Sequence, residues 1–525
     1  MNPHHVFYTS TERTGNFVVS SSDIFSFQGV SWLVCTTEVP RYPAHKYQHP
    51  LSFHLVPIGH VVMIFTSRRI RTVGRIWNLA RFLSSKPEIR PFEEIPGPKE
   101  LPVVGSLVKF LQTKEGYHEF FHNMHQEHGD VVKFSIMGAQ AVSVCRPEHI
   151  KEVYTTNQSS PLREALEPWV IYRKERNLPL GATLELSQYT QDEEAWRKYR
   201  RPISMLLRPE LVTSYVKRVS HVASDLADAL RMTNSEPVSL TQLRNFTSAY
   251  GFEAICAILM GKSMGALVRG EVSDETRKLN RQFMDSVDSL FRISDKMIFK
   301  EVPLWRYFHT SSRQELFRSF DEMYGLGGQL FAARDRDRDP RFTDDGVMDF
   351  FDIADTESEK LSVAERQVVG TELIGAGVDT TSNAAQWVLL LMAQRPEVQE
   401  RLAASIRSVM GEHRPGQRIS AEQVKELKLH DFVDETLRLH PVLPTGSRLF
   451  NKDMELFGYH IPAFTLIKLN NWTASKDSRN FQNPSEFDET RSPRKECPFA
   501  NKTFGVGARQ CTCMCANLTC TKWNE

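Results

Sequence analysis

The longest helical pattern in the chain spans residues 362–395 and contains no proline. Ser362, followed three residues later by Glu365, forms a capping box, which is typical of the first turn of a helix. At a rise of 1.5 Å per residue, about 32 residues make a helix of about 48 Å, which would cross a whole domain. We therefore predict one long central helix.

The middle of this helix, residues 375–381, reads Gly-Ala-Gly-Val-Asp-Thr-Thr. Two glycines weaken a helix locally, and a threonine hydroxyl can replace a backbone hydrogen-bond partner, which opens a kink. An acid–alcohol pair such as Asp379 and Thr380 is costly in an apolar helix unless it has partners. The segment indicates a functional interruption of the helix. The alternative is a glycine cluster that serves helix packing.

Most of the remaining chain also has helical periodicity. Residues 131–135 and 141–144 predict a short hairpin around Gly138. A second cap, Ser420 with Gln423, precedes the helix that carries Glu435 and Arg438. Residues 280–310 mix apolar and basic side chains and suit either a lid that dips into a membrane or a plain buried helix. Together these patterns predict a mainly α protein with a small β region.

The first hundred or so residues follow a different pattern. Residues 1–62 are expected to be a poorly structured leader or upstream extension, because Met63 offers a second start. The apolar run at 55–65 holds Pro57 and is shorter than the roughly twenty residues of a membrane-spanning helix, so we expect none. Residues 63–94 are basic and amphipathic, which is typical of a mitochondrial presequence; the alternative is a basic surface helix. A Pro-rich hinge from residue 95 then begins the catalytic body.

Composition narrows the class of protein. The chain is 41% hydrophobic and 25% charged, and its net charge is +1. It therefore lacks the overall excess of basic residues that would indicate a nucleic-acid partner. Eight cysteines are present, and those before residue 511 have no framework spacing. This pattern favours a reducing compartment over a secreted disulfide fold.

Residues 504–511 carry the most specific signal, Phe-Gly-Val-Gly-Ala-Arg-Gln-Cys. Glycines allow a tight turn and close approach to a flat ligand, and a cysteine thiolate is an axial ligand of haem iron. The string F-G-x-G-x-R-x-C resembles the haem-binding signature of the cytochrome P-450 family. Residues 376–381 resemble the oxygen-binding motif of that family, and Trp196 with Arg200 resembles its W-x-x-x-R helix.

The resemblance spans about residues 95–511 and implies the cytochrome P-450 fold. It implies haem b, with Cys511 as the axial ligand of the iron, and proton delivery by Asp379 and Thr380. It also implies a buried ion network of Glu435, Arg438 and Arg491. The other residues that it places at the cofactor are Trp196, Arg200, Ala376, Gly377, Arg448, Phe504 and Arg509.

The resemblance points to the animal mitochondrial branch, on the evidence of Glu167-Pro-Trp and Tyr172-Arg173. It implies a monooxygenase that inserts one oxygen atom of O₂ into a lipophilic, steroid-like substrate. Its electrons would come from a ferredoxin of the adrenodoxin type. Its location would be the matrix side of the mitochondrial inner membrane, with peripheral membrane contact.

Two departures from the family pattern stand out. Asp434 and His430 occupy positions where the mitochondrial branch usually has lysines for ferredoxin docking, although Lys425, Lys428 and Lys495 could compensate. Cys513 replaces a glycine after Cys511, and residues 512–525 form a divergent Cys-rich tail that suggests a truncated or misspliced C-terminus. The alternative function is therefore an impaired family member that binds haem poorly or not at all. A zinc site in the tail is a third hypothesis, although its cysteine spacing is tighter than that of a typical zinc knuckle.

Overall fold

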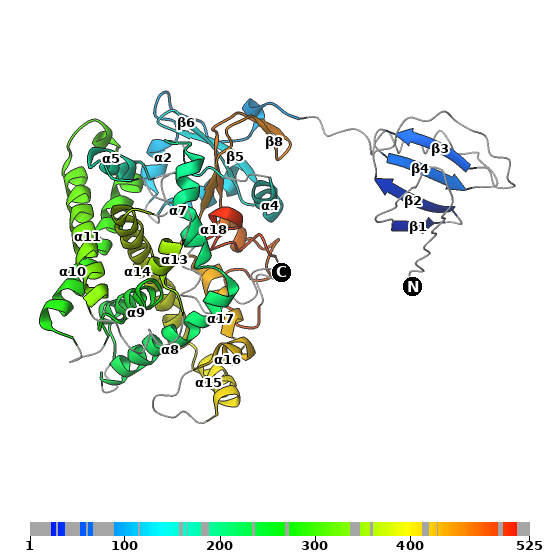
Figure 1. The fold of residues 1–525 in the computed structure, drawn as a ribbon. Coiled ribbons are helices and arrows are strands. Elements are labelled where there is room, and N and C mark those ends of the chain that lie inside the picture. Colours follow the sequence, from blue (N-terminus) through cyan, green and yellow to red (C-terminus); the bar gives the residue numbers. More distant parts are fainter. Residues whose placement is uncertain are drawn as a thin grey trace. The chain divides into compact units, whose positions relative to one another are not determined.

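The computed structural model (Figure 1) describes two units, residues 1–89 and 90–525. In the first unit, the described residues are Ile89 and those of four strands. In the second, the structure describes residues 90–511 except 114–115, 157–160, 165, 180–186, 188, 234–236, 268–271, 337–346, 357–360, 412–418, 428 and 492–496. The Cys-rich tail lies outside the described residues, as does most of the presequence-like segment.

The first unit contains an antiparallel sheet of β1 (Asp23–Phe27), β2 (Val30–Thr36), β3 (Phe53–Ile58) and β4 (Val61–Thr66) in the order β1-β2-β4-β3. Strands β1, β2 and β3 and the first two residues of β4 lie within residues 1–62, the segment expected to be a poorly structured leader. The apolar run at 55–65 falls on β3 and β4, which pair with Ile58 opposite Val61. Apolar and β-branched residues favour strands as well as membrane segments, and a run this short suits two paired strands.

The second unit is mainly helical, which confirms the predicted fold class. A layer of long helices comprises α8 (Pro209–Arg231), α9 (Leu240–Met260), α10 (Asp274–Asp295) and α11 (Ser311–Arg336), with α14 (Val363–Ala393) in the middle (Figure 1). Shorter helices surround it: α2 (Leu107–Gln112), α3 (Tyr117–His128), α4 (Pro147–Thr155), α5 (Glu167–Glu175), α7 (Glu193–Met205), α13 (Phe350–Thr356), α15 (Pro396–Met410), α16 (Ala421–Glu426), α17 (Leu429–Leu439) and α18 (Asn471–Ser475).

The long central helix is confirmed as α14, with 31 residues and the predicted capping box at Ser362 and Glu365. Glycines bring it very close to α9. A Cβ on Gly251 would lie 2.8 Å from the carbonyl oxygen of Val378, and one on Gly377 would lie 2.7 Å from Cγ1 of Ile255. Neither contact leaves space for a side chain, so the glycines fix the position of the Asp379–Thr380 segment against α9.

The β region holds the predicted hairpin, β5 (Val131–Ile136) and β6 (Ala139–Val144), with Gly138 at φ +80°. Strand β10 (Leu466–Leu469) pairs parallel to β6, and β7 (Gly446–Arg448) pairs antiparallel to β10. A separate hairpin joins β8 (Met454–Leu456) to β9 (Tyr459–Ile461). The second predicted cap opens only the six residues of α16, and Glu435 lies on the next helix, α17.

The segment between α10 and α11 contains a π-helical turn, η2 (Lys296–Lys300), and a 3₁₀ turn, η3 (Leu304–Arg306). Leu290, Met297 and Trp305 are buried in the core, as the alternative of a buried helix predicted. The exposed apolar side chains are different ones: Val302, Leu304, Tyr307 and Phe308. Among the described residues, no helix has the length and apolarity that crossing a membrane requires.

Candidate haem-thiolate site

Cys511 lies at the end of a closed loop. Its backbone N–H donates to the carbonyl oxygen of Phe504 at 2.9 Å, and a 3₁₀ turn, η4 (Gly507–Arg509), lies between them. Gly505 and Gly507 have φ of +68° and +75°, a region that disfavours residues with a Cβ. The side chain of Cys511 is half-buried. The two glycines of the motif therefore permit the turn that presents the sulfur.

Helix α7 packs against this loop through the two residues of its W-x-x-x-R motif. Nη2 of Arg200 donates to the carbonyl oxygen of Gln510 at 2.6 Å, and the Arg509 guanidinium lies 4.7 Å from the ring centre of Trp196. Trp196 is 3% exposed, and its indole N–H has no hydrogen-bond partner among the described residues. A buried donor without a partner costs about 1–3 kcal/mol, so a ligand with an acceptor is favoured at this position.

Four buried or half-buried arginines gather beside the loop. Arg200 comes from α7, Arg448 from β7, Arg509 from the loop itself, and Arg163 from the segment that follows α4. Burial, together with Arg448 and Arg200, lowers the pKa of Arg163 to about 10. Burial and the other three arginines lower the pKa of Arg509 to about 8. The side chain of Cys511 raises the pKa values of Arg163 and Arg200, so its sulfur lies within electrostatic range of both guanidinium groups.

Arg163 is the member of this cluster that the sequence analysis missed. It is a lone arginine in a loop, four residues before Glu167, and its role becomes visible only through its burial beside Arg448 and Arg200. Arg448 also lies over the ring of Tyr154 at 4.9 Å, and its Nη2 reaches the carbonyl oxygen of Val506 at 3.5 Å. The cluster therefore joins the β region to the Cys511 loop.

The Asp379–Thr380 pair lies midway along α14, which is unbroken through this segment. The hydroxyl of Thr380 donates to the carbonyl oxygen of Ala376 at 2.7 Å, four residues earlier. Burial and the carboxylate of Asp288 raise the pKa of Asp379, while Arg244 and a hydrogen bond to Asn383 oppose the rise. Ala376 is half-buried and Gly377 is buried.

A model of the family described as cytochrome P450 matches residues 95–513. This chain belongs to the cytochrome P450 family. Its members are haem-containing monooxygenases.

Several mitochondrial enzymes are similar to this cytochrome P450. The cholesterol side-chain cleavage enzyme of Rattus norvegicus is 28% identical over 448 residues, which cover 82% of this chain and 80% of the relative. The 1,25-dihydroxyvitamin D(3) 24-hydroxylase of Mus musculus is 26% identical over 438 residues, which cover 82% and 81%. The cholesterol side-chain cleavage enzyme of Ovis aries is 26% identical over 434 residues, with 80% of each chain covered.

The residues beside Cys511 fit the haem of a cytochrome P450. Haem carries two carboxylates, and arginine binds carboxylates through a planar pair of N–H groups. The cluster holds four cations, and burial together with the neighbouring arginines lowers the pKa values of Arg163 and Arg509. The indole N–H of Trp196 supplies one more buried donor. The arginine cluster and the buried indole N–H of Trp196 are both explained if a dianion with a flat apolar body binds beside Cys511.

The predicted ion network is assembled from α17 and a later loop. Glu435 and Arg438 are fully buried and joined by two hydrogen bonds of 2.7 and 2.8 Å; Nε of Arg491 donates to Glu435 at 3.1 Å. Arg438 also donates to the carbonyl oxygens of Ser475, Pro484 and Glu486. The network therefore ties the segment that precedes the Cys511 loop to α17.

The expected effect of Asp434 on docking needs a correction. Asp434 is only 4% exposed, so its carboxylate does not present a charge to a partner protein. His430 is half-exposed and lies 3.2 Å from Asp431, which precedes a buried turn of the same helix. Lys425 is exposed, whereas Lys428 and Lys495 lie outside the described residues.

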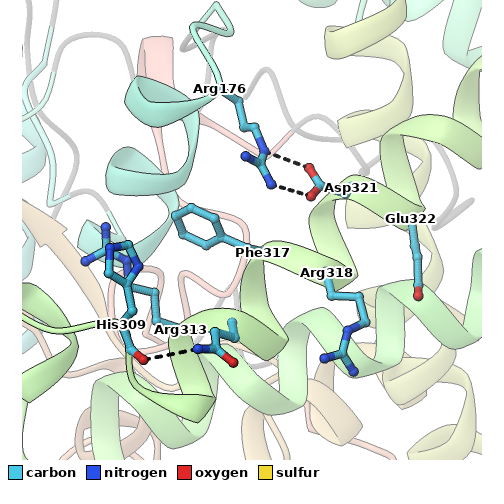
Figure 2. A pocket seen from close by; sticks show the side chains of 8 residues that line it. Arg176, His309, Arg313, Phe317, Arg318, Asp321 and Glu322 are labelled. Atoms are coloured by element: carbon cyan, nitrogen blue, oxygen red, sulfur yellow. Dashed lines mark hydrogen bonds and ion pairs between the residues drawn. The ribbon is translucent and has the colours of Figure 1, made fainter.

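A surface groove of the second unit lies elsewhere. A groove of about 580 Å³ lies against α11 and the end of α5 (Figure 2), and it is lined by Arg176, His309, Arg313, Gln314, Phe317, Arg318, Asp321 and Glu322. Arg176 and Asp321 form a two-bonded ion pair across it. Its charges largely cancel, and none of its residues belongs to the predicted site, so we assign it no part in the chemistry. Among the described residues, no cluster of three or more His, Cys, Asp or Glu side chains could hold a metal ion.

Proposed function

We propose that this cytochrome P450 is a mitochondrial haem-thiolate monooxygenase of a sterol-like lipid, with Cys511 as the axial ligand of the haem iron. When bound, haem b would supply the redox centre at which O₂ is activated. The observation that supports the proposal most strongly is the arginine cluster beside Cys511, because four crowded cations fit a dicarboxylate.

The residues around the sulfur would hold the cofactor by charge and hydrogen bonding. Arg163, Arg200, Arg448 and Arg509 would bind its carboxylates, and the indole of Trp196 would donate to one of them. The bond from Arg200 to the carbonyl oxygen of Gln510 places a cation one residue from Cys511, which favours the thiolate over the thiol.

The polar pair on α14 would handle protons. Burial and Asp288 raise the pKa of Asp379, which makes this carboxyl a better proton carrier than an exposed aspartate. The hydroxyl of Thr380 donates to the carbonyl oxygen of Ala376 and would be the proton donor next to Asp379 on this helix.

The mitochondrial relatives support a proposal for the electron donor and the location. We propose a ferredoxin as the donor, on the matrix side of the inner membrane. Peripheral contact with that membrane would be made by four exposed apolar side chains, with Lys300 before them and Arg306 among them: Val302, Leu304, Tyr307 and Phe308.

The carbon monoxide difference spectrum of the reduced protein tests the proposal. A thiolate ligand gives a strongly red-shifted Soret band, and Cys511→Ser should abolish it while the arginine cluster still retains some haem. A purified protein without haem would instead support the impaired family member. Turnover with a microsomal diflavin reductase but not with a ferredoxin would refute the mitochondrial part of the proposal.

A further inference from the structure

A second polar cluster lies on α14 one helical turn before Ala376. Glu372 of α14 accepts from the hydroxyl of Tyr324, on α11, at 2.9 Å, and from Nη2 of Arg173, on α5. The same nitrogen of Arg173 lies 3.0 Å from the Tyr324 hydroxyl. Arg173 is fully buried, and the Glu372 side chain is 11% exposed. Three helices that are far apart in sequence thus meet at one carboxylate.

The position of Glu372 relates this cluster to the reactive segment. Glu372, Ala376 and Thr380 recur at four-residue intervals, so they lie on one face of α14. All three are half-buried, whereas Leu373 and Gly377 between them are buried. Because α14 runs through the middle of the helical body (Figure 1), partial exposure along one stripe indicates a face that is not closed by packing. Eight residues place Glu372 about 12 Å from Thr380 along the axis.

We propose that Arg173, Glu372 and Tyr324 form the polar recognition point of the substrate, and that they bind a hydroxyl group at the end of a sterol-like lipid remote from the carbon that is oxidised. This inference rests on the proposed function and names the substrate class of the same site. The roughly 12 Å between Glu372 and Thr380 suits an elongated, rigid molecule that lies along α14.

The charges and donors of the cluster select the kind of polar group. Arg173 and Glu372 neutralise each other, so the cluster suits a neutral partner rather than an anion or a cation. A carboxylate has about four acceptor positions, so Glu372 can accept a substrate O–H in addition to its protein donors. The Tyr324 hydroxyl donates its proton to Glu372, so beside it this oxygen acts as an acceptor. The pKa of Tyr324 is raised by burial and by Glu372, which keeps that hydroxyl neutral. A substrate hydroxyl, which donates and accepts, matches this arrangement better than a ketone, which only accepts.

A simpler interpretation is that the cluster only joins α5, α11 and α14. The same junction offers a matched control for that case. Tyr172, on α5, belongs to the same aromatic stack as Tyr324 and donates its hydroxyl to Asp321 at 2.8 Å. Asp321 pairs with Arg176 at the surface groove (Figure 2), so this hydroxyl belongs to the solvent side of the junction. Loss of the Tyr172 hydroxyl removes one inter-helix bond and loss of the Tyr324 hydroxyl removes two, and only Tyr324 contacts Glu372.

The experiment measures the affinities of the full-length protein for cholesterol and for cholest-5-ene, which lacks the hydroxyl, by quenching of tryptophan fluorescence. We expect wild type to prefer cholesterol by about tenfold or more, the effect of one hydrogen bond to a charged group. Tyr324→Phe and Glu372→Gln should weaken only cholesterol binding and reduce the preference to about threefold or less. Tyr172→Phe should retain the full preference.

Three results would overturn the inference: equal wild-type affinities, no binding of either sterol, or an equal loss for both sterols in Tyr324→Phe and Glu372→Gln. The fluorescence readout needs no haem spectrum. A protein without the thiolate-type Soret band that still distinguishes the two sterols would therefore refute the proposed function and not this inference.

Discussion

Replacing Arg509 by methionine should change stability in opposite directions in the haem-free and the haem-loaded protein. Methionine keeps most of the apolar stem but removes one of four crowded charges. In the haem-free protein, this relieves repulsion from Arg163, Arg448 and Arg200. In the haem-loaded protein, the same change removes a carboxylate partner.

The size of the effect follows from the lowered pKa of Arg509. The difference between its ordinary value of 12.5 and about 8 corresponds to about 6 kcal/mol at about 1.36 kcal/mol per pKa unit. This is an upper bound, because burial contributes most of the change and the partly exposed side chain is screened by solvent. We expect a gain of roughly 2–3 kcal/mol for the haem-free variant, which raises its Tm by roughly 2–3 °C for a body of this size.

The assay compares thermal unfolding of haem-free wild type and Arg509→Met, and then the rate of haem transfer from each loaded protein to apomyoglobin. Transfer from the variant should be about tenfold faster or more, because a hydrogen-bonded charge pair is lost. The exposed Arg208→Met is the control and should change neither quantity. If Arg509→Met destabilises the haem-free protein, repulsion among the four arginines does not govern this site and the reasoning fails.

Two further predictions follow from the same structure. Gly251→Ala should lower the free energy of unfolding, measured in urea, by about 1–3 kcal/mol, because the new Cβ would lie 2.8 Å from a backbone oxygen of α14. Gly328→Ala on α11 is the control: its Cβ has open space, so it should raise the free energy of unfolding by up to about 1 kcal/mol. Arg491→Gln should lower the free energy of unfolding by about 3–5 kcal/mol, because buried Glu435 loses one of its partners. Arg401→Gln breaks an exposed pair with Glu489 and should lower it by less than about 1 kcal/mol. Equal losses would show that burial does not determine how much the network contributes to stability.

The parts of the site that were predictable are those written as local patterns. Two glycines and a cysteine at fixed spacing predicted the loop that ends at Cys511, and Trp196 with Arg200 predicted one helix face. A capping box and a proline-free run predicted α14 almost to its ends.

What could not be predicted depends on tertiary burial. Arg163 has no motif, and its membership of the cluster arises from three other segments that surround it. Asp434 was predicted to be a surface charge from its place in the pattern, yet α17 turns it inward. The sequence showed that the apolar run at 55–65 is too short for a membrane-spanning helix. It could not show that the run divides into β3 and β4, because that division depends on pairing of β4 with a distant strand, β2.

The origin of the four arginines suggests why the cofactor matters for folding as well as for chemistry. Arg200 belongs to α7, whose Tyr199 and Ile203 pack into the large helical core, whereas Arg448 lies on β7, beside a second core built on the β region. Arg163 and Arg509 come from loops between these cores. Without an anion, like charges repel across this junction; with a dicarboxylate bound, the same residues attract each other through it. A ligand that binds only the folded state adds its binding free energy to stability. Haem at this site should therefore strengthen the junction of the two cores, and its loss should weaken that junction before it disturbs the packing of α14 against α9.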